Sequence, residues 1–296
     1  MQLTGAFTAL VTPFSASLEV DFAALDKLVD TQIAGGISGL VPCGTTGESP
    51  TLDDEEHVAV IARVVARAAK RVPVVAGTGS NCTREAIAMS RRAVEVGADA
   101  VMIVMPYYNK PTQAGLIAHV EQVAAAVPST PVVLYNIPGR CGIDLMPDAV
   151  EAICRSTPNV VAIKEATGNV LRAQELLRRL GDRLTVLSGD DALTLAMMAC
   201  GARGVISVTS NAFPREVSAV CASMLAGKVD DARRKHLALL PVHDVMFVES
   251  NPAPVKLVLA DAGAIAPHVR APMVMPSAPA AAKVREVVAA FRGAGK

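Results

Sequence analysis

The chain has 296 residues, of which 51% are hydrophobic and 19% are charged, and its formal net charge at pH 7 is zero. This length and composition are typical of a protein with one large buried core. The balanced charge and the aromatic content of 3% argue against nucleic acid and anionic membranes as partners, since these are bound by basic or base-stacking surfaces.

The lack of targeting signals and the scattered cysteines favour a cytoplasmic protein. No stretch approaches the roughly 20 apolar residues of a membrane-spanning helix, and the residues after Met1 lack the positive cluster of a secretion signal. The six cysteines are scattered, which argues against a disulfide framework or a zinc knuckle and favours a reducing compartment. The five histidines are also dispersed without ligand spacing, so we expect no metal site.

Short runs of branched apolar residues alternate eight times with longer stretches of helical period. Because these runs are apolar on both faces, they are expected to form a parallel sheet that helices cover. The predicted strands are 7–14, 37–44, 72–77, 100–106, 131–138, 160–165, 184–189 and 204–209.

Helix signals lie between these strands. Asp21 begins an amphipathic stretch that Gly35 ends, and Asp53 with Glu56 has the pattern of a capping box. Another helix is predicted to begin at Thr83. The chain therefore consists of repeated strand–helix units.

Eight such units in about 225 residues predict an α/β fold, a (β/α)8 TIM barrel, over residues 1–226. The strand rhythm then stops, and residues 227–296 are expected to form a C-terminal helical region packed on the barrel. Its predicted helices are 230–240, 254–261 and 278–291. An open doubly wound sheet is less favoured, since no Gly-x-Gly-x-x-Gly turn follows the first strand.

Catalytic groups of such barrels come from the C-terminal ends of the strands. Polar and reactive residues gather at these ends: Gly44–Ser49, Tyr107 and Tyr108, Tyr135–Arg140, Lys164, Gly189–Asp191, and Ser207–Asn211. We therefore expect one site at the barrel mouth. Asp190 and Asp191 would repel a phosphate there, so the expected substrate is a carboxylate.

Lys164 is a lone charge at the end of an apolar run. Strand alternation places Lys164, Ala162 and Val160 on one face and Glu165 on the other. With no carboxylate beside it, burial should lower the pKa of the lysine, and a neutral amine forms Schiff bases with carbonyl compounds. The alternative is a lysine that reaches solvent and pairs with Glu165.

Two further features fit imine chemistry. Tyr135 ends the strand before the lysine strand, where its hydroxyl could move protons to and from a carbinolamine; the alternative is a packed ring with a wet hydroxyl. The turn Gly44-Thr45-Thr46-Gly47 offers N–H groups and hydroxyls that can bind a carboxylate. A merely solvated turn is the alternative.

Four motifs resemble the dihydrodipicolinate synthase family, which belongs to the pyruvate-dependent class I aldolases that include N-acetylneuraminate lyase. The motifs are Gly44-Thr45-Thr46-Gly47-Glu48-Ser49, Tyr135-Asn136-Ile137-Pro138-Gly139-Arg140, Lys164-Glu165-Ala166-Thr167-Gly168-Asn169 and Ser188-Gly189-Asp190-Asp191. They occur in order and in register with the predicted strands. The resemblance extends from Gly5 to Lys256.

This resemblance implies that Lys164 forms a Schiff base with pyruvate. The resulting enamine would attack the aldehyde of L-aspartate 4-semialdehyde, and cyclisation would give 4-hydroxy-tetrahydrodipicolinate, on the route to lysine and diaminopimelate. Tyr135, Thr46 and Tyr108 would form a proton relay, with Tyr108 supplied by a neighbouring subunit. No metal or organic cofactor would take part.

The resemblance also implies the positions that bind substrate: Thr45 and Thr46 for the pyruvate carboxylate, Arg140 for the semialdehyde carboxylate, and Gly189 and the carbonyl of Ile206 near the lysine. A forked guanidinium suits a carboxylate. One departure is Cys141, because the family usually has threonine after the arginine.

Two other hypotheses stay open. N-acetylneuraminate lyases and sugar-acid aldolases share the lysine and the tyrosine, but they generally lack the arginine motif and the Lys-Glu-Ala-Thr-Gly continuation, so they rank second. A barrel that binds a keto acid as a sensor, without turnover, is an alternative from another class.

Regulation and assembly are also suggested by the resemblance. In lysine-inhibited relatives, a feedback site at the dimer interface uses residues that match five here: Ser49, His57, Asn81, Glu85 and Tyr107. Asp54 and Pro50 depart from that pattern. Alternatively, Glu85 only complements a helix dipole and His57 lies on a solvated face. A homotetramer of two tight dimers is implied.

Overall fold

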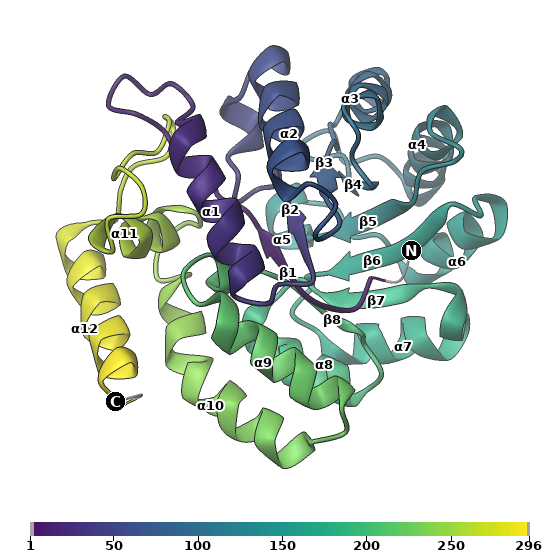
Figure 1. Ribbon diagram of the computed structural model, residues 1–296. Helices are drawn as coiled ribbons and strands as arrows, with labels where there is room; N and C mark the ends of the chain where they lie inside the picture. Colours follow the sequence, from purple (N-terminus) through teal and green to yellow (C-terminus); the bar gives the residue numbers. More distant parts are fainter. Residues whose placement is uncertain (1–2, 295–296) are drawn as a thin grey trace.

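The computed structural model describes residues 3–294 as a ring of eight parallel strands surrounded by helices (Figure 1). The strand order is β2-β1-β8-β7-β6-β5-β4-β3, and Leu40 pairs in parallel with Val74 to close the ring between β2 and β3. The predicted (β/α)8 TIM barrel is confirmed.

All eight predicted strands are present. They are β1 Gly5–Ala9, β2 Gly39–Val41, β3 Val75–Gly77, β4 Ala100–Val104, β5 Val132–Asn136, β6 Val160–Glu165, β7 Thr185–Ser188 and β8 Gly204–Ser207. The prediction of a first strand over 7–14 is wrong at both ends. After β1 the chain turns toward the loops at the mouth, where Val11 N–H donates to Asn211 Oδ1 (3.0 Å) and Thr12 Oγ1 donates to Gly47 O (2.7 Å).

The helices of the barrel alternate with the strands. They are α1 Phe22–Ala34, α2 Asp54–Ala68, α3 Thr83–Glu95, α4 Gln113–Ala126, α5 Pro138–Cys141, α6 Pro147–Ser156, α7 Val170–Leu180, α8 Thr194–Ala199 and α9 Pro214–Leu225, with 3-10 turns η1 Ser49–Thr51, η2 Gly181–Arg183, η3 Asp191–Leu193 and η4 Thr209–Asn211. The expected caps are confirmed: Asp21 accepts from Ala24 N–H (2.9 Å), and Asp53 and Glu56 form a capping box.

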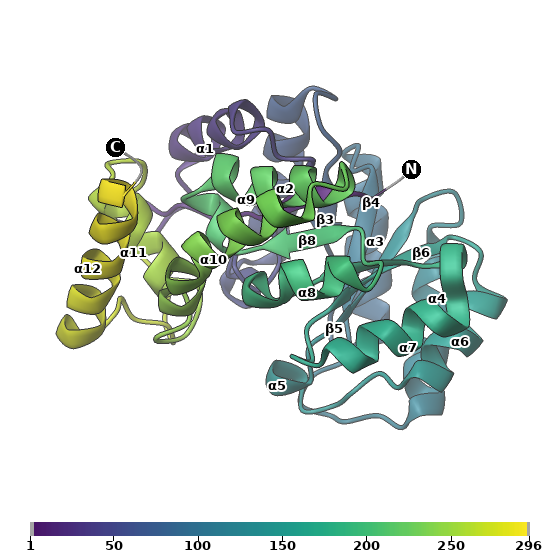
Figure 2. The same cartoon turned by 90° about the horizontal axis from the view of Figure 1, so that it is seen from below.

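Three helices follow the barrel: α10 Val229–Val245, α11 Ala253–Asp261 and α12 Ala278–Ala294. Figure 2 shows them gathered on one side of the molecule. The first continues through Pro241, beyond its predicted end. Their buried apolar residues belong to the same cluster as those of the barrel helices, and the division of the chain at residue 226 stays a prediction.

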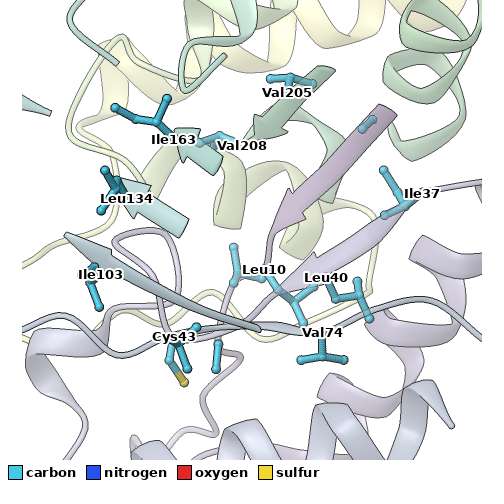
Figure 3. Close-up of a cluster of buried hydrophobic side chains, with 14 of the residues drawn as sticks. Leu10, Ile37, Leu40, Cys43, Val74, Ile103, Leu134, Ile163, Val205 and Val208 are labelled. Atoms are coloured by element: carbon cyan, nitrogen blue, oxygen red, sulfur yellow. The ribbon is translucent and has the colours of Figure 1, made fainter. Parts of the chain in front are cut away.

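The strands lie between two layers of apolar side chains. The outer layer lies between strands and helices and includes Leu40, Ile103, Leu134, Ile163 and Val205 from five strands (Figure 3). The inner layer fills the barrel, and its buried residues are Leu3, Phe7, Ala9, Val41, Val75, Ala100, Met102, Val133, Tyr135, Ala162, Leu187 and Ile206. Successive strand residues alternate between the two layers, as expected for parallel strands covered by helices.

The predicted alternation fails at the start of β6. Val132 pairs with Val160 but Val133 pairs with Ala162, so one residue is skipped. Val160 therefore lies in the outer layer, whereas Ala162 lies in the inner layer. From Ala162 onward the alternation holds, and Lys164 extends inward as expected.

Candidate active site

Lys164 is the last residue but one of β6, at the carboxyl end of the barrel, and it is only 4% exposed. Its Nζ lies 4.2 Å from the centroid of the Tyr135 ring. Burial lowers the pKa of Lys164 from its ordinary value to about 8. Glu165 turns away and accepts from Thr167 N–H (2.8 Å) and from Asn136 Nδ2 (3.2 Å). The alternative pairing of Lys164 with Glu165 is wrong.

The carboxylate of Asp191 influences Lys164 but belongs to another segment of the chain, so the residues around Lys164 did not predict it. Asp191 is buried after β7 and accepts from Ser207 Oγ (2.5 Å), Val208 N–H (2.8 Å) and Thr209 N–H (3.1 Å). Its negative charge raises the pKa of Lys164, but this effect is smaller than the lowering by burial. Asp191 therefore moderates the reactivity of the amine from a distance.

Tyr135 is the last residue but one of β5 and is paired with Lys164 in the strand register. The residue is 4% exposed and its ring lies in the inner layer. Burial raises the pKa of Tyr135 to about 12, while the Thr45 hydroxyl and the Arg140 charge lower it. The phenol is thus protonated at neutral pH and adjacent to the amine, as a proton donor must be.

The turn after β2 places two hydroxyls at the same end of the barrel. Its backbone bonds join Gly47 N–H to Gly44 O (3.1 Å) and Glu48 N–H to Thr45 O (3.1 Å). Thr45 is half-buried, whereas Thr46 is buried and accepts a hydrogen bond from Asn251 Nδ2 (3.0 Å). The merely solvated turn does not describe Thr46. Asn251 belongs to the C-terminal region and was not among the predicted site residues.

The C-terminal region makes a second set of contacts with this turn, through Glu48. Lys256 of α11 is 0% exposed and pairs with the buried carboxylate of Glu48. Its ammonium also donates to His268 O (3.0 Å) and lies 4.2 Å from the Phe14 ring centroid, and Arg270 N–H donates to the other Glu48 oxygen (2.9 Å). A lone charge inside an apolar run was the available sequence signal for Lys256, as it was for Lys164.

Arg140 and Tyr108 lie at the rim of the mouth. Arg140, in α5, is exposed, and its Nη2 donates to Asn251 O (3.4 Å). Cys141 beside it is buried, and burial raises the pKa of its thiol to about 11. Tyr108 is 89% exposed and has a left-handed backbone conformation (φ 73°). Within one chain it therefore lies outside the group of buried residues that includes Lys164, Tyr135 and Thr46.

Gly189 and Ile206 complete the predicted set. Gly189 N–H donates to Glu165 O (2.7 Å), and a Cβ at this position would lie 2.6 Å from Ala166 Cβ and 3.1 Å from Lys164 Cγ. Only glycine permits this approach to the lysine stem. Ile206 of β8 is buried in the inner layer.

Four of the five residues of the predicted feedback site line a cavity of about 700 Å³ beside the mouth. The cavity is lined by Ser49, His57, Glu85 and Tyr107, and Thr45 and Arg140 also line it. Asn81 donates to Tyr107 O (3.2 Å). The alternative of a solvated His57 is wrong, because its ring is buried and lies 2.7 Å from Gly77 O.

Two features are absent from residues 3–294. No group of three or more His, Cys, Asp and Glu side chains there could hold a metal ion. Within the same residues, none of the helices combines the length and the apolar character needed to cross a membrane.

A (β/α)8 barrel with a buried lysine at the carboxyl end of β6 is the arrangement expected of an aldolase-type enzyme. The model of the dihydrodipicolinate synthetase family matches residues 2–291, and the chain belongs to this family. The resemblance seen in the motifs is confirmed.

Individual relatives agree with this assignment. The 4-hydroxy-tetrahydrodipicolinate synthase of Sorangium cellulosum (strain So ce56) is 61% identical over 290 residues, which are 98% of this chain and 95% of the relative. The structure of the enzyme of that name from Methylacidiphilum fumariolicum SolV has a TM-score of 0.97 at 42% identity, covering 99% of this chain and 97% of that one. The chloride-inhibited dihydrodipicolinate synthase from Acinetobacter baumannii, complexed with pyruvate, has a TM-score of 0.96 at 41% identity and covers 98% and 99%.

Proposed function

We propose that the protein condenses pyruvate with L-aspartate 4-semialdehyde to give 4-hydroxy-tetrahydrodipicolinate, in the biosynthesis of lysine and diaminopimelate. Its relative from Sorangium cellulosum bears the name of this activity. The observation that carries the proposal is the amine of Lys164, which is buried, has a pKa lowered to about 8, and lies against the Tyr135 ring.

The first step is formation of the imine. With a pKa of about 8, about a tenth of the Lys164 side chains are neutral at pH 7 and can attack the keto carbon of pyruvate. Tyr135 supplies the proton with which the carbinolamine hydroxyl leaves as water. Thr45 and Thr46 hold the pyruvate carboxylate through the hydroxyls and N–H groups of their turn.

The second step forms the carbon–carbon bond. Loss of a methyl proton converts the imine to an enamine, whose carbon attacks the aldehyde of the semialdehyde. Arg140 at the rim binds the carboxylate of this second substrate. The amine of the substrate then displaces Lys164, which closes the ring and frees the enzyme.

A neighbouring subunit supplies the last member of the relay. Tyr108 is 89% exposed in a single chain, and a second copy that packs on this rim would bring the Tyr108 hydroxyl to Thr46 and Tyr135. We infer a homotetramer built from two such tight dimers, following the family. Sedimentation of the purified protein tests this assembly: a mass of four chains supports it, and a monomer that is fully active contradicts it.

Feedback by L-lysine is a further prediction for the cavity beside the mouth. Glu85 offers a carboxylate for the ligand ammonium, and Asn81 and Tyr107 offer polar groups for its carboxylate. Asp54 and Pro50, the two departures, also line this cavity. Titration of the initial rate with L-lysine decides, and an unchanged rate at millimolar ligand would refute the prediction.

A cytoplasmic location also stays a prediction. It is supported by the six cysteines, all of which are free thiols in the structure. Such thiols are typical of a reducing compartment.

A coupled assay tests the proposed activity against its alternatives. The enzyme receives pyruvate with either L-aspartate 4-semialdehyde or N-acetylmannosamine, and the consumption of pyruvate is measured. We expect turnover with the semialdehyde. Turnover of the sugar alone would favour the lyase, and pyruvate binding without turnover of either aldehyde would favour the sensor.

A further inference from the structure

Asn251 connects the C-terminal region with two parts of the mouth. The residue is 4% exposed and directly precedes Pro252 and α11. Its side-chain Nδ2 donates to Thr46 Oγ1 (3.0 Å), and its backbone carbonyl accepts from Arg140 Nη2 (3.4 Å). One residue therefore contacts both the predicted relay and the predicted binding site of the second substrate.

The direction of the bond between Asn251 and Thr46 decides where a proton can go. An amide nitrogen only donates, so Thr46 Oγ1 is the acceptor in this contact. A hydroxyl has one proton, and that proton must then point toward another group. The Thr46 hydroxyl can therefore donate its proton to a group of the relay instead of to Asn251.

The other polar atom of the Asn251 amide is not engaged elsewhere. Its Oδ1 is buried and has no hydrogen-bond partner within residues 3–294. Turning the amide over would place Oδ1 against the Thr46 hydroxyl, which would then have to donate its only proton to Asn251. With Nδ2 facing Thr46, that proton stays free for another acceptor.

We propose that Asn251 is a positioning residue: it fixes Thr46 as a hydrogen-bond acceptor and so directs the Thr46 proton into the relay. This role rests on the proposed function, in which Thr46 carries a proton between Tyr135 and the partner subunit. The ion pair between Lys256 and Glu48 holds the same segment against the same turn. The C-terminal region thus takes part in the chemistry rather than only in packing.

Two substitutions separate proton direction from mere support. Asn251→Ala removes the donor, and we expect kcat to fall about tenfold, the value of one neutral hydrogen bond, while KM for pyruvate changes by less than about twofold. Asn251→Asp keeps the shape but has no N–H, so it accepts the Thr46 proton. We expect it to lower kcat by about a hundredfold, more than Asn251→Ala. A kcat for Asn251→Asp at or above that of Asn251→Ala would overturn the proposal.

A double-mutant cycle gives a second, independent test. In a Thr46→Val background there is no proton to direct, so Asn251→Ala should lower kcat no further. Equal effects of Asn251→Ala in both backgrounds would overturn the proposal. This cycle decides even where the Asp variant fails to fold.

A matched control covers loss of stability. Asn159 precedes β6, at the other end of the strands, and its Nδ2 donates to the carbonyls of Ala124 (3.0 Å), Val127 (3.1 Å) and Thr130 (3.2 Å). Asn159→Ala should lower the melting temperature and leave kcat unchanged. Should the wild-type protein fail to convert pyruvate and the semialdehyde, the proposed function fails; an active wild type with an additive cycle contradicts the positioning role alone.

Discussion

Two lysines are buried among residues 3–294, and they differ in whether a carboxylate pairs with them. Lys164 at the barrel mouth is surrounded by apolar and phenolic groups, and burial is the largest influence on its pKa, which falls to about 8. Lys256 in α11 is buried at least as deeply, and burial lowers its pKa too, but the paired Glu48 carboxylate opposes this lowering, and His268 O accepts from the ammonium. A buried charge without a partner loses its proton more easily than an exposed one, whereas a buried charge with a partner can hold two segments together.

Replacing Lys164 should have the largest effect on activity. Lys164→Ala removes the nucleophile, so kcat should fall by at least about 10⁴-fold. The free energy of unfolding should stay the same or rise, because a desolvated amine is removed. Steady-state kinetics and thermal unfolding check both halves.

A surface lysine provides the control for this variant. Lys27 of α1 is exposed, and Lys27→Ala should keep wild-type kcat. Residual activity of Lys164→Ala within tenfold of the wild type would contradict the assigned role.

Replacing Lys256 should affect stability instead. Lys256→Met leaves the Glu48 carboxylate buried without its cationic partner, which should lower the free energy of unfolding by about 3–5 kcal/mol. The double variant with Glu48→Gln should recover part of this loss. Denaturant unfolding measures the difference. A Lys256→Met protein of wild-type stability would show that the ion pair does not stabilise the fold.

Tyr135→Phe tests the group that faces the unpaired lysine. The ring and its contact with Lys164 remain, but the proton donor is lost, so kcat should fall by about 10²-fold. KM for pyruvate should change little, since the hydroxyl acts in the proton transfer. Initial rates over a range of pyruvate concentrations check this, and a kcat within twofold of the wild type would exclude the phenol as the donor.

The smallest effect is expected from the distant carboxylate. The charge of Asp191 raises the pKa of Lys164, so Asp191→Asn should lower that pKa further. The amine then becomes neutral at lower pH, and the rising limb of the rate of pyruvate adduct formation should move toward acid by up to about one pH unit. A shift toward alkali would contradict the assignment, provided that melting curves show a folded protein.

Most of the fold could be predicted from regular patterns in the sequence. Eight apolar runs predicted eight strands, because strands covered on both faces must be apolar throughout. The strand ends predicted the mouth, and a lone charge after an apolar run singled out Lys164. The skipped residue in β6 was not predictable, since it depends on how Val132 and Val133 pair with that strand.

The residues that support the site were harder to predict. Asn251 contacts Thr46, and Lys256 contacts Glu48, across more than two-thirds of the chain. No local pattern joins such distant positions, because only the packing of α11 against the barrel brings them together. Lys256 did carry a signal, a charge within the apolar residues of α11, but the pattern alone could not tell a brace from a nucleophile.

Reductive trapping with pyruvate and borohydride, followed by peptide mapping at several pH values, tests the contrast between the two lysines most directly. We predict one adduct, on Lys164, with none on Lys256, and a trapping rate that is half-maximal near pH 8, the lowered pKa of Lys164. An adduct on another lysine, or a rate that rises only near the ordinary lysine pKa of about 10.4, would contradict the account.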